Sequence, residues 1–280
     1  MSRFSNFLLC EEYDSKTRVQ KIGTEEALDL LDNCVKSVKN DRFPIYRGKR
    51  NTGNFNFVDP QKFTRVSANT QNYYTLLFSN LPSWKNYPKR QKSLICTTNE
   101  ATANGYGYVY YVFPYDEAKI GVCPKTDLWN SFPGFIDDMG GIPFLNSVIG
   151  TIKEYYKMDS LNSYEQLVSL FEKADRVNKT TWKDIFNTAW TENFITLFRE
   201  MGYMEERTRL INCIDKYFDP KKSGFKIMKP GNSYPKDKEV WTDSKCILMR
   251  RNNKDVWAIN EKYGTDYPQS TEGDPDWDEI

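Results

Sequence analysis

Apolar side chains recur at a helical period near the start of the chain. Residues 24–39 place their apolar positions on one helical face, and Thr24 stands before them as a candidate cap. The apolar positions are Leu28, Leu31, Val35 and Val38. The pattern predicts one helix over residues 24–39.

The same period returns over residues 161–218, which we expect to be helical. Ser163 and Gln166 have the spacing of a capping box, in which each side chain bonds to the other residue's backbone N–H. Two further helices are predicted here, one starting at Thr181 and one over residues 205–217.

Short runs rich in aromatic and β-branched residues predict strands. They lie at residues 43–48, 93–98, 106–114, 119–123, 238–241 and 246–249. Residues 49–70 look irregular, and an apolar stretch follows at 73–78. The order of helix, strands, helices and strands predicts an α+β fold rather than alternating βαβ units.

Charge and composition restrict the chemistry. The 280 residues include 39 Lys and Arg against 38 Asp and Glu, so the net charge gives no global reason for nucleic-acid or membrane binding. The sequence contains no histidine, which removes the usual Ser-His-Asp, Cys-His and His-based metal sites. Catalysis must depend on carboxylates, Arg, Lys, hydroxyls, Tyr or Cys.

The cysteines are scattered and form no CxxC pair, so we expect no metal site and interpret them as buried free thiols. They are Cys10, Cys34, Cys96, Cys123, Cys213 and Cys246. The apolar run near the N-terminus is too short for a signal peptide or a membrane span. We therefore expect a soluble, cytoplasmic protein.

Three polar features stand where predicted strands begin or end. They are Tyr46-Arg47-Gly48, Cys96-Thr97-Thr98-Asn99 and Asp237-Lys238-Glu239. Each one alone has an ordinary explanation, as a surface arginine, a strand terminus or a solvated turn. In this order, and in a chain without histidine, they resemble the Arg–Ser/Thr–Glu class of mono-ADP-ribosyltransferases, the cholera-toxin-like and C3-like families.

Neighbouring segments extend the resemblance over residues 24–150 and 236–250. Gly107-Tyr-Val-Tyr-Tyr-Val-Phe-Pro and Gly140-Gly-Ile-Pro are similar to toxin segments, and Arg65-Val-Ser-Ala-Asn-Thr is similar to phage-encoded transferases. The resemblance implies a split β-sheet core with an inserted helical region. Residues 1–150 and 219–265 would form that core, 151–218 the insertion and 266–280 an acidic flexible tail.

The resemblance implies that NAD is a substrate and that nicotinamide leaves. Because the leaving group departs neutral, an oxocarbenium-like sugar needs a nearby carboxylate more than a strong acid. Glu239 would supply that carboxylate and Thr97 would orient it. Arg47 would grip the pyrophosphate through its planar donors. A toxin or phage protein of this class acts in the cytoplasm, of the host if phage-encoded.

Other residues receive supporting roles. Gly48 would let the dinucleotide approach closely, and Thr98 would stand beside Thr97. Asp237, two residues before Glu239 on a strand, would share its face and act on the acceptor, with an exposed turn carboxylate as the alternative. The aromatic rings that could stack on NAD are those of Tyr73, Tyr106 and Phe113, with core packing as the alternative.

Some assignments stay open. The resemblance departs from the family where Thr-Thr-Asn replaces Ser-Thr-Ser and Asp237 replaces Gln or Glu. Asp137 and Asp138, before the Gly-Gly-Ile-Pro segment, are rivals to Glu239. The acceptor could be a protein or a nucleic acid, and a basic-aromatic run would suit RNA or DNA. That run contains Lys85, Lys89, Arg90 and Lys92. A non-catalytic binding protein and an NAD glycohydrolase are the alternatives.

Overall fold

The computed structural model describes residues 19–50, 53–66, 71–132, 134–136, 139–177, 199, 202–203 and 208–268. These residues form two compact units. The first unit takes the described residues within Met1–Asn69, Tyr87–Leu128 and Phe225–Ile280, and the second takes those within Thr70–Asn86 and Trp129–Gly224. The predicted α+β class is confirmed, because helices accompany an antiparallel sheet of nine strands.

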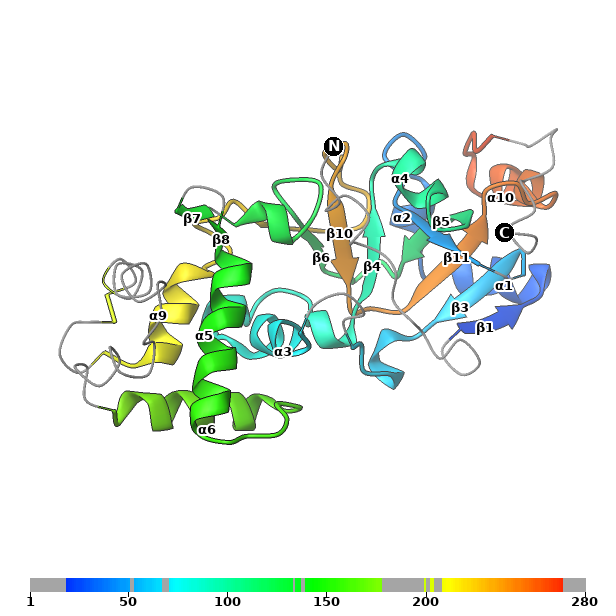
Figure 1. Ribbon diagram of the computed structural model, residues 1–280. Helices are drawn as coiled ribbons and strands as arrows, with labels where there is room; N and C mark the ends of the chain where they lie inside the picture. Colours follow the sequence, from blue (N-terminus) through cyan, green and yellow to red (C-terminus); the bar gives the residue numbers. More distant parts are fainter. Residues whose placement is uncertain are drawn as a thin grey trace. The chain divides into compact units, whose positions relative to one another are not determined.

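The first unit contains that nine-stranded sheet (Figure 1). In chain order its strands are β1 (Val19–Ile22), β2 (Tyr46–Lys49), β3 (Phe55–Val58), β4 (Leu94–Thr97), β5 (Tyr108–Pro114), β6 (Ile120–Val122), β9 (Lys226–Met228), β10 (Glu239–Thr242) and β11 (Cys246–Arg250). Across the sheet the order is β1-β3-β11-β5-β2-β4-β10-β6-β9. The two C-terminal strands, β10 and β11, are therefore inserted among strands from the first half of the chain.

The sheet has a narrow joint between β2 and β4. These strands are paired only at Tyr46 and Thr97 within the described residues, whereas β2 and β5 pair from Tyr46 to Lys49. Strands β4 and β10 pair along their full lengths. One half of the sheet, β1-β3-β11-β5-β2, thus joins the other, β4-β10-β6-β9, through very few backbone hydrogen bonds.

Helices cover one face of the first half of the sheet. Helices α1 (Thr24–Leu31), α2 (Val35–Val38) and α10 (Val256–Tyr263) bury side chains against β3, β5 and β11 in one apolar cluster. The opposite face carries a second cluster, which includes Tyr110, Leu248 and, from loops, Phe63 and Tyr234. Helix α4 (Glu100–Asn104) packs beside β2. Turns η1 (Pro60–Lys62) and η3 (Arg90–Lys92) complete the unit.

The prediction of one helix over residues 24–39 was wrong. The chain leaves the helix after Leu31 and starts a second one at Val35, with Asp32 and Asn33 in the turn between them. Thr24 is also not the cap. Gly23 occupies that position, and the Thr24 hydroxyl donates to Asp255 Oδ2 at 2.7 Å.

The expectation that residues 49–70 are irregular was also wrong. Strand β3 lies there, between β1 and β11, with Phe55 and Val58 buried. Phe55 and Phe57 alternate with Asn54 and Asn56, but the signal is weak because asparagine has a low strand propensity. The strand expected at 106–114 begins at Tyr108, after Gly107 with its φ of 131°.

The second unit is mainly helical. Its elements are α3 (Tyr73–Asn80), η2 (Pro82–Trp84), η4 (Trp129–Ser131), β7 (Gly134–Ile136), β8 (Met139–Gly140), α5 (Gly141–Tyr155), α6 (Tyr164–Asp175) and α9 (Leu210–Tyr217). The predicted capping box of Ser163 and Gln166 is present at the start of α6. The helix predicted from Thr181 lies outside the described residues. Residues 129–150, assigned to the core from sequence, fall in this unit.

Two expectations about the rest of the chain have definite outcomes. Cys34, Cys96, Cys123, Cys213 and Cys246 are free and buried, as predicted, and Cys10 lies outside the described residues. The tail predicted at residues 266–280 is described only to residue 268, and this first part is docked, whereas residues 269–280 lie outside the described residues. Tyr267 is 2% exposed, packs on Tyr111 and donates to the Val38 carbonyl at 2.7 Å. No helix in the described part of the chain has the length and apolarity to cross a bilayer.

Candidate functional site

Glu239 and Thr97 face each other across two neighbouring strands. Strand β10 begins at Glu239 and β4 ends at Thr97, and the antiparallel register pairs these two residues directly. Directly paired residues point to the same face of a sheet. Each is 4% exposed. The fold thus brings together two residues that the sequence places 142 positions apart, taking 97 from 239.

Both oxygens of the Glu239 carboxylate are bound. Arg90 donates from Nη1 to Oε1 at 2.6 Å, forming an ion pair whose side chains are 3% and 5% exposed. The backbone N–H of Leu128 donates to Oε2 at 3.3 Å, a longer and weaker bond. A buried carboxylate that accepts a hydrogen bond from a charged donor is strongly held in one orientation.

Trp241 holds Arg90 in place. The Arg90 guanidinium lies 5.0 Å from the centre of the Trp241 ring, and the indole N–H donates to the Pro88 carbonyl at 2.9 Å. Gly121 makes room for the ring, since a Cβ there would stand 2.3 Å from Trp241 Cε2. Arg90 is therefore clamped between an aromatic face and Glu239.

Three residues that begin or end segments of the first unit also lie beside β10. They are Tyr87, Leu128 and Phe225. The Tyr87 ring stacks 6.3 Å from Trp241, and the Phe225 ring meets the indole edge-on at 6.2 Å. The Tyr87 hydroxyl donates to the Phe225 carbonyl at 3.0 Å. Leu128, the last residue of its segment, is the backbone donor to Glu239. The surroundings of Glu239 are thus built from distant parts of the chain.

Arg47 is near this pair in the sheet but not on its face. Tyr46 pairs with Thr97 and with Tyr111, so the Arg47 side chain points to the opposite face, which carries Tyr110. Arg47 is 6% exposed and donates from Nη1 to the Ile95 carbonyl of β4. Its guanidinium therefore crosses the narrow joint between β2 and β4.

Gly48 is required by the protein's own packing. A Cβ at this position would stand 1.8 Å from the Ala103 carbonyl oxygen and 2.9 Å from the Tyr106 Cβ. Helix α4 thus occupies the space that the sequence interpretation reserved for a dinucleotide. The Tyr106 side chain is half-buried beside Gly48.

The turn before β10 differs from the sequence prediction. Asp237 was expected to share a strand face with Glu239, but β10 begins at Glu239 and Asp237 has a left-handed φ of 57°. The alternation of strand side chains therefore does not apply to it. Its carboxylate is exposed and accepts a hydrogen bond from the side-chain amide of Asn99.

Thr98 fastens this turn to β4. Its hydroxyl donates to the Pro235 carbonyl at 2.7 Å and accepts from the Lys238 N–H at 2.9 Å. Its own N–H donates to the Lys238 carbonyl at 2.9 Å. These bonds fix the backbone that leads into Glu239, so Thr98 contributes structure next to the candidate site.

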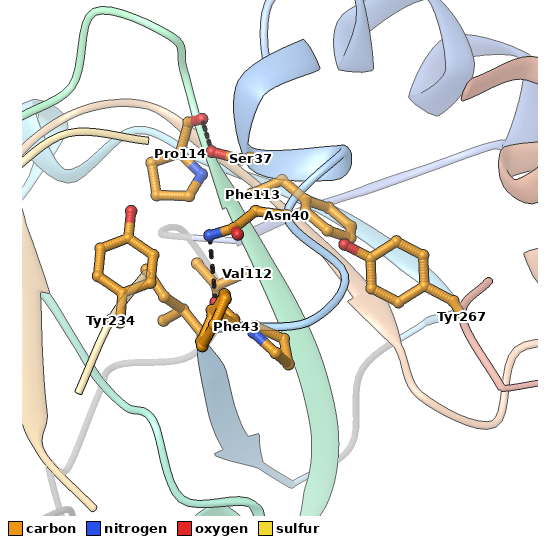
Figure 2. A pocket seen from close by; sticks show the side chains of 10 residues that line it. Ser37, Asn40, Phe43, Val112, Phe113, Pro114, Tyr234 and Tyr267 are labelled. Carbon is orange, nitrogen blue, oxygen red and sulfur yellow. Dashed lines mark hydrogen bonds between the residues drawn. The ribbon is translucent and has the colours of Figure 1, made fainter. Parts of the chain in front are cut away.

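Figure 2 shows a small hollow of the first unit, and Glu239 is not among the residues that line it. Phe113 lines it together with Phe43, Tyr234 and Tyr267, and Phe113 itself is 2% exposed. The hollow has room for about one water molecule. Phe113 therefore packs in the core here. Tyr73 lies in the second unit, where its hydroxyl donates to Asn146.

The basic-aromatic run does not lie on one surface. Arg90 is 2% exposed, and the rings of Trp84 and Tyr87 are 2% and 7% exposed, so these rings are not presented for base stacking. Lys89 is exposed. The Lys92 ammonium donates to Thr64 Oγ1 at 3.0 Å. Lys85 is an exposed residue of the second unit.

No protein family, curated protein or solved structure matches this chain. The geometry of its own residues therefore has to carry the functional argument. Asp137 and Asp138, the rivals of Glu239, lie outside the described residues. Within the described part of the chain, no group of three or more Cys, Asp or Glu side chains is placed to hold a metal ion.

Proposed function

We propose that this chain transfers ADP-ribose from NAD to a macromolecular acceptor, either a protein or a nucleic acid, and releases nicotinamide. The observation that carries the proposal is the buried pair of Glu239 and Thr97 on adjacent strands. The strand of Arg47 follows next in the sheet, so the segments that resemble the transferase motifs are neighbours in space. A split-sheet transferase core is part of the same proposal, and the narrow β2–β4 joint supports it.

The chemistry needs a fixed negative charge beside the ribose. Breaking the nicotinamide–ribose bond leaves positive charge on the sugar while nicotinamide departs neutral, and the acceptor nucleophile then bonds to the sugar carbon. In this mechanism Glu239 accepts a hydrogen bond from a ribose hydroxyl and stabilises that cation. A preorganised contact of this kind contributes about 3–4 kcal/mol to the transition state.

In the proposed mechanism Arg90 holds the Glu239 carboxylate in position. Its 2.6 Å bond to Oε1 fixes the carboxylate in one orientation. The ribose hydroxyl takes the place of the Leu128 N–H on Oε2, because that 3.3 Å bond is the weaker of the two. Thr97 lies beside Glu239 on the same face, and its hydroxyl accepts a hydrogen bond from the Asn99 N–H at 3.1 Å.

Arg47 receives a different role from the one expected of it. Its register directs the side chain away from Glu239, and its guanidinium bonds to the backbone of β4 at Ile95. In the proposed enzyme Arg47 is a positioning residue that holds β2 against β4 near Thr97. The guanidinium on the side of Glu239 is that of Arg90.

One observation favours a second candidate, a non-catalytic protein with a transferase-like core. The Glu239 carboxylate has a donor on each oxygen and is 4% exposed, an arrangement that is also typical of a purely structural ion pair. In that case Glu239 would stabilise the fold and bind no sugar.

Incubation with NAD labelled in the adenosine part separates these functions. We expect free nicotinamide and label on a macromolecule when the protein is added to a lysate. Glu239→Gln should reduce nicotinamide release per folded molecule by about a hundredfold or more, because it removes the charge beside the ribose. Tryptophan fluorescence gives the folded fraction, since the variant leaves Arg90 buried without its partner. Glu261→Gln, an exposed glutamate of α10, is the matched control and should leave the rate unchanged.

The alternatives give different results in the same assay. Nicotinamide release without labelled macromolecule would identify an NAD glycohydrolase, with water as the acceptor. No release from the wild-type protein would support the non-catalytic candidate. Full activity in Glu239→Gln would contradict the proposed mechanism.

A further inference from the structure

Strand β9 forms one edge of the nine-stranded sheet, and within the described residues no strand lies beyond it. Its inner side pairs with β6, where Ile227 lies opposite Gly121. Lys226 and Ile227 are exposed, and the exposed fraction of Ile227 is 40%, large for an isoleucine in a sheet. The outer side of β9 is therefore open to another chain.

The backbone of Ile227 points to this open side. Directly after β6, the Cys123 N–H donates to the Glu239 carbonyl of β10 at 2.9 Å, so the backbone groups of Cys123 face β10. Backbone groups alternate along a strand, so those of Val122 face β9 and its paired residue Lys226. Ile227 follows Lys226 and alternates again. Its N–H and C=O therefore face outward, and within the described residues they have no partner.

Both ends of β9 are fastened to the rest of the first unit. At the start, the Phe225 carbonyl accepts a hydrogen bond from the Tyr87 hydroxyl at 3.0 Å. At the end, the Lys229 N–H donates to Asn232 Oδ1 at 2.8 Å, and the Lys229 carbonyl accepts from the Tyr234 hydroxyl at 3.0 Å. An edge that is already held in place loses little conformational freedom when another strand pairs with it.

The exposed Ile227 side chain lies on the same face of the sheet as Glu239. Ile227 pairs with Gly121 and Gly121 with Trp241, so these residues share one face. Trp241 and Glu239 are two residues apart on β10, so Glu239 belongs to that face as well. A chain that adds to β9 would therefore lie beside the face that carries Glu239.

Positive charge surrounds the open edge. Lys226 and Lys229 are exposed, and neither forms an ion pair within the described residues. Residues 225–238 contain four lysines and a single acidic residue, Asp237. Like charges on paired strands repel each other, so the lysines disfavour pairing of β9 with a second copy of itself. The same charges favour a strand with acidic side chains.

We propose that the outer edge of β9 binds an extended, acidic segment of a partner protein, which adds to the sheet as a further strand. The segment exchanges backbone hydrogen bonds with Ile227, packs an apolar side chain on it, and places acidic side chains near Lys226 and Lys229. Peptides bind other sheet edges in the same way, with affinity from the main chain and specificity from the side chains. A nucleic acid has no peptide backbone to pair with Ile227.

In the proposed transferase, on whose activity this step rests, the partner is the acceptor, and the acceptor is therefore a protein. Strand β10 lies two places from β9, so the added strand stands three places from it, about 15 Å away. About five extended residues cover this distance. We expect the modified side chain about that far along the acceptor chain from the docked segment.

Fluorescence anisotropy tests the docking with a labelled octapeptide in which glutamate and valine alternate. The peptide should bind the full-length protein at low ionic strength, and added salt should weaken the binding. The matched peptide with lysine in place of glutamate should not bind. Hydrogen exchange at the Ile227 amide should become slower when the acidic peptide is present. No binding of the acidic peptide, or equal binding of both peptides, would overturn the proposal.

Two substitutions at Ile227 separate its backbone from its side chain. Ile227→Pro removes the outward N–H and leaves the bonds to β6, since proline is tolerated where a strand N–H faces solvent. It should weaken binding about threefold to tenfold beyond the loss in Ile227→Ala, which keeps the N–H. Equal affinities of the two variants would show that no strand is added at this edge.

Charge reversal tests the choice of partner. Lys226→Glu combined with Lys229→Glu should weaken binding of the acidic peptide about tenfold. Lys245→Glu, an exposed lysine between β10 and β11, is the matched control and should bind like the wild type. Equal losses in the double variant and the control would contradict recognition at β9.

The binding assay contains no NAD, so its result does not depend on catalysis. If the protein releases nicotinamide, Ile227→Pro should keep the rate of release into water while the transfer of label to protein falls. A labelled oligothymidylate provides the last comparison. Tighter binding of this oligonucleotide than of the acidic peptide, with losses in the same variants, would identify a nucleic-acid partner and overturn the proposal.

Discussion

The two faces of the sheet around β2, β4 and β10 differ in the charges that lie near one another. On one face Glu239 is buried with Arg90, and each charge has its counterpart within 2.6 Å. On the other face, burial and then the nearby charges of Arg47 and Lys21 lower the pKa of Lys49 to about 8. The first arrangement pairs opposite charges, whereas the second brings like charges near one another.

The difference teaches where substitutions should be costly. Removing one partner of a complete buried pair leaves an uncompensated charge, which destabilises the fold. Removing one member of a cluster of like charges relieves repulsion and stabilises the fold. The same kind of change, from a cation to methionine, should therefore act with opposite sign on the two faces.

Arg90→Met should have the largest effect on stability. It leaves the Glu239 carboxylate buried without its partner, so we expect a loss of about 3–5 kcal/mol in the free energy of unfolding. Urea denaturation monitored by tryptophan fluorescence measures it. Adding Glu239→Gln to Arg90→Met should recover a large part of the loss. A loss below about 1 kcal/mol in the single variant would show that the pair is not buried as described.

Gly121→Ala should have an intermediate effect. The new methyl group would stand 2.3 Å from Trp241, so the ring that carries Arg90 must shift. We expect a destabilisation of about 1–3 kcal/mol, as for overpacking in other cores. Gly150→Ala, in helix α5 with nothing within 4 Å of the new Cβ, is the matched control. It should stabilise by up to about 1 kcal/mol, and equal effects of both variants would be inconsistent with a packed Trp241.

Lys49→Met should have the smallest effect, with a defined pH dependence. Lys49 titrates at about 8 in the folded state and near about 10.4 when unfolded. Its burial therefore costs stability below pH 8, and that cost fades as pH rises through this interval. The variant should be more stable by about 1 kcal/mol at pH 7 after allowing for solvent screening. A gain that grows between pH 8 and 10 would contradict this sign.

Local sequence patterns predict the elements that depend on local residues. Strand β5 carries an unbroken run of β-forming residues, and α6 has its capping box, so both are found from sequence. Strand β3 was missed because it is short and its asparagine has a low strand propensity, although its backbone pairs with both neighbours. The turn at Asp237 was missed because a left-handed φ leaves little trace in sequence when the residue is not glycine.

The site is harder to predict because it depends on strand register. The pairing of Glu239 with Thr97 requires β10 to lie beside β4, and no local pattern encodes that neighbour. Arg90 was interpreted as part of a basic surface run, because its burial depends on Trp241 and Glu239, which lie far away in sequence. A one-residue difference in position likewise separates the face of Tyr46 from that of Arg47.

The position of β10 between β4 and β6 has a consequence for how the protein is made. Strands β4 and β6, complete at Thr97 and Val122, both need β10 between them, yet β10 ends only at Thr242. During synthesis the ribosome must therefore deliver the whole second unit before these two strands find their shared neighbour. Until then their unpaired edges can associate with other nascent chains, so chaperone supply should govern the yield of the native protein.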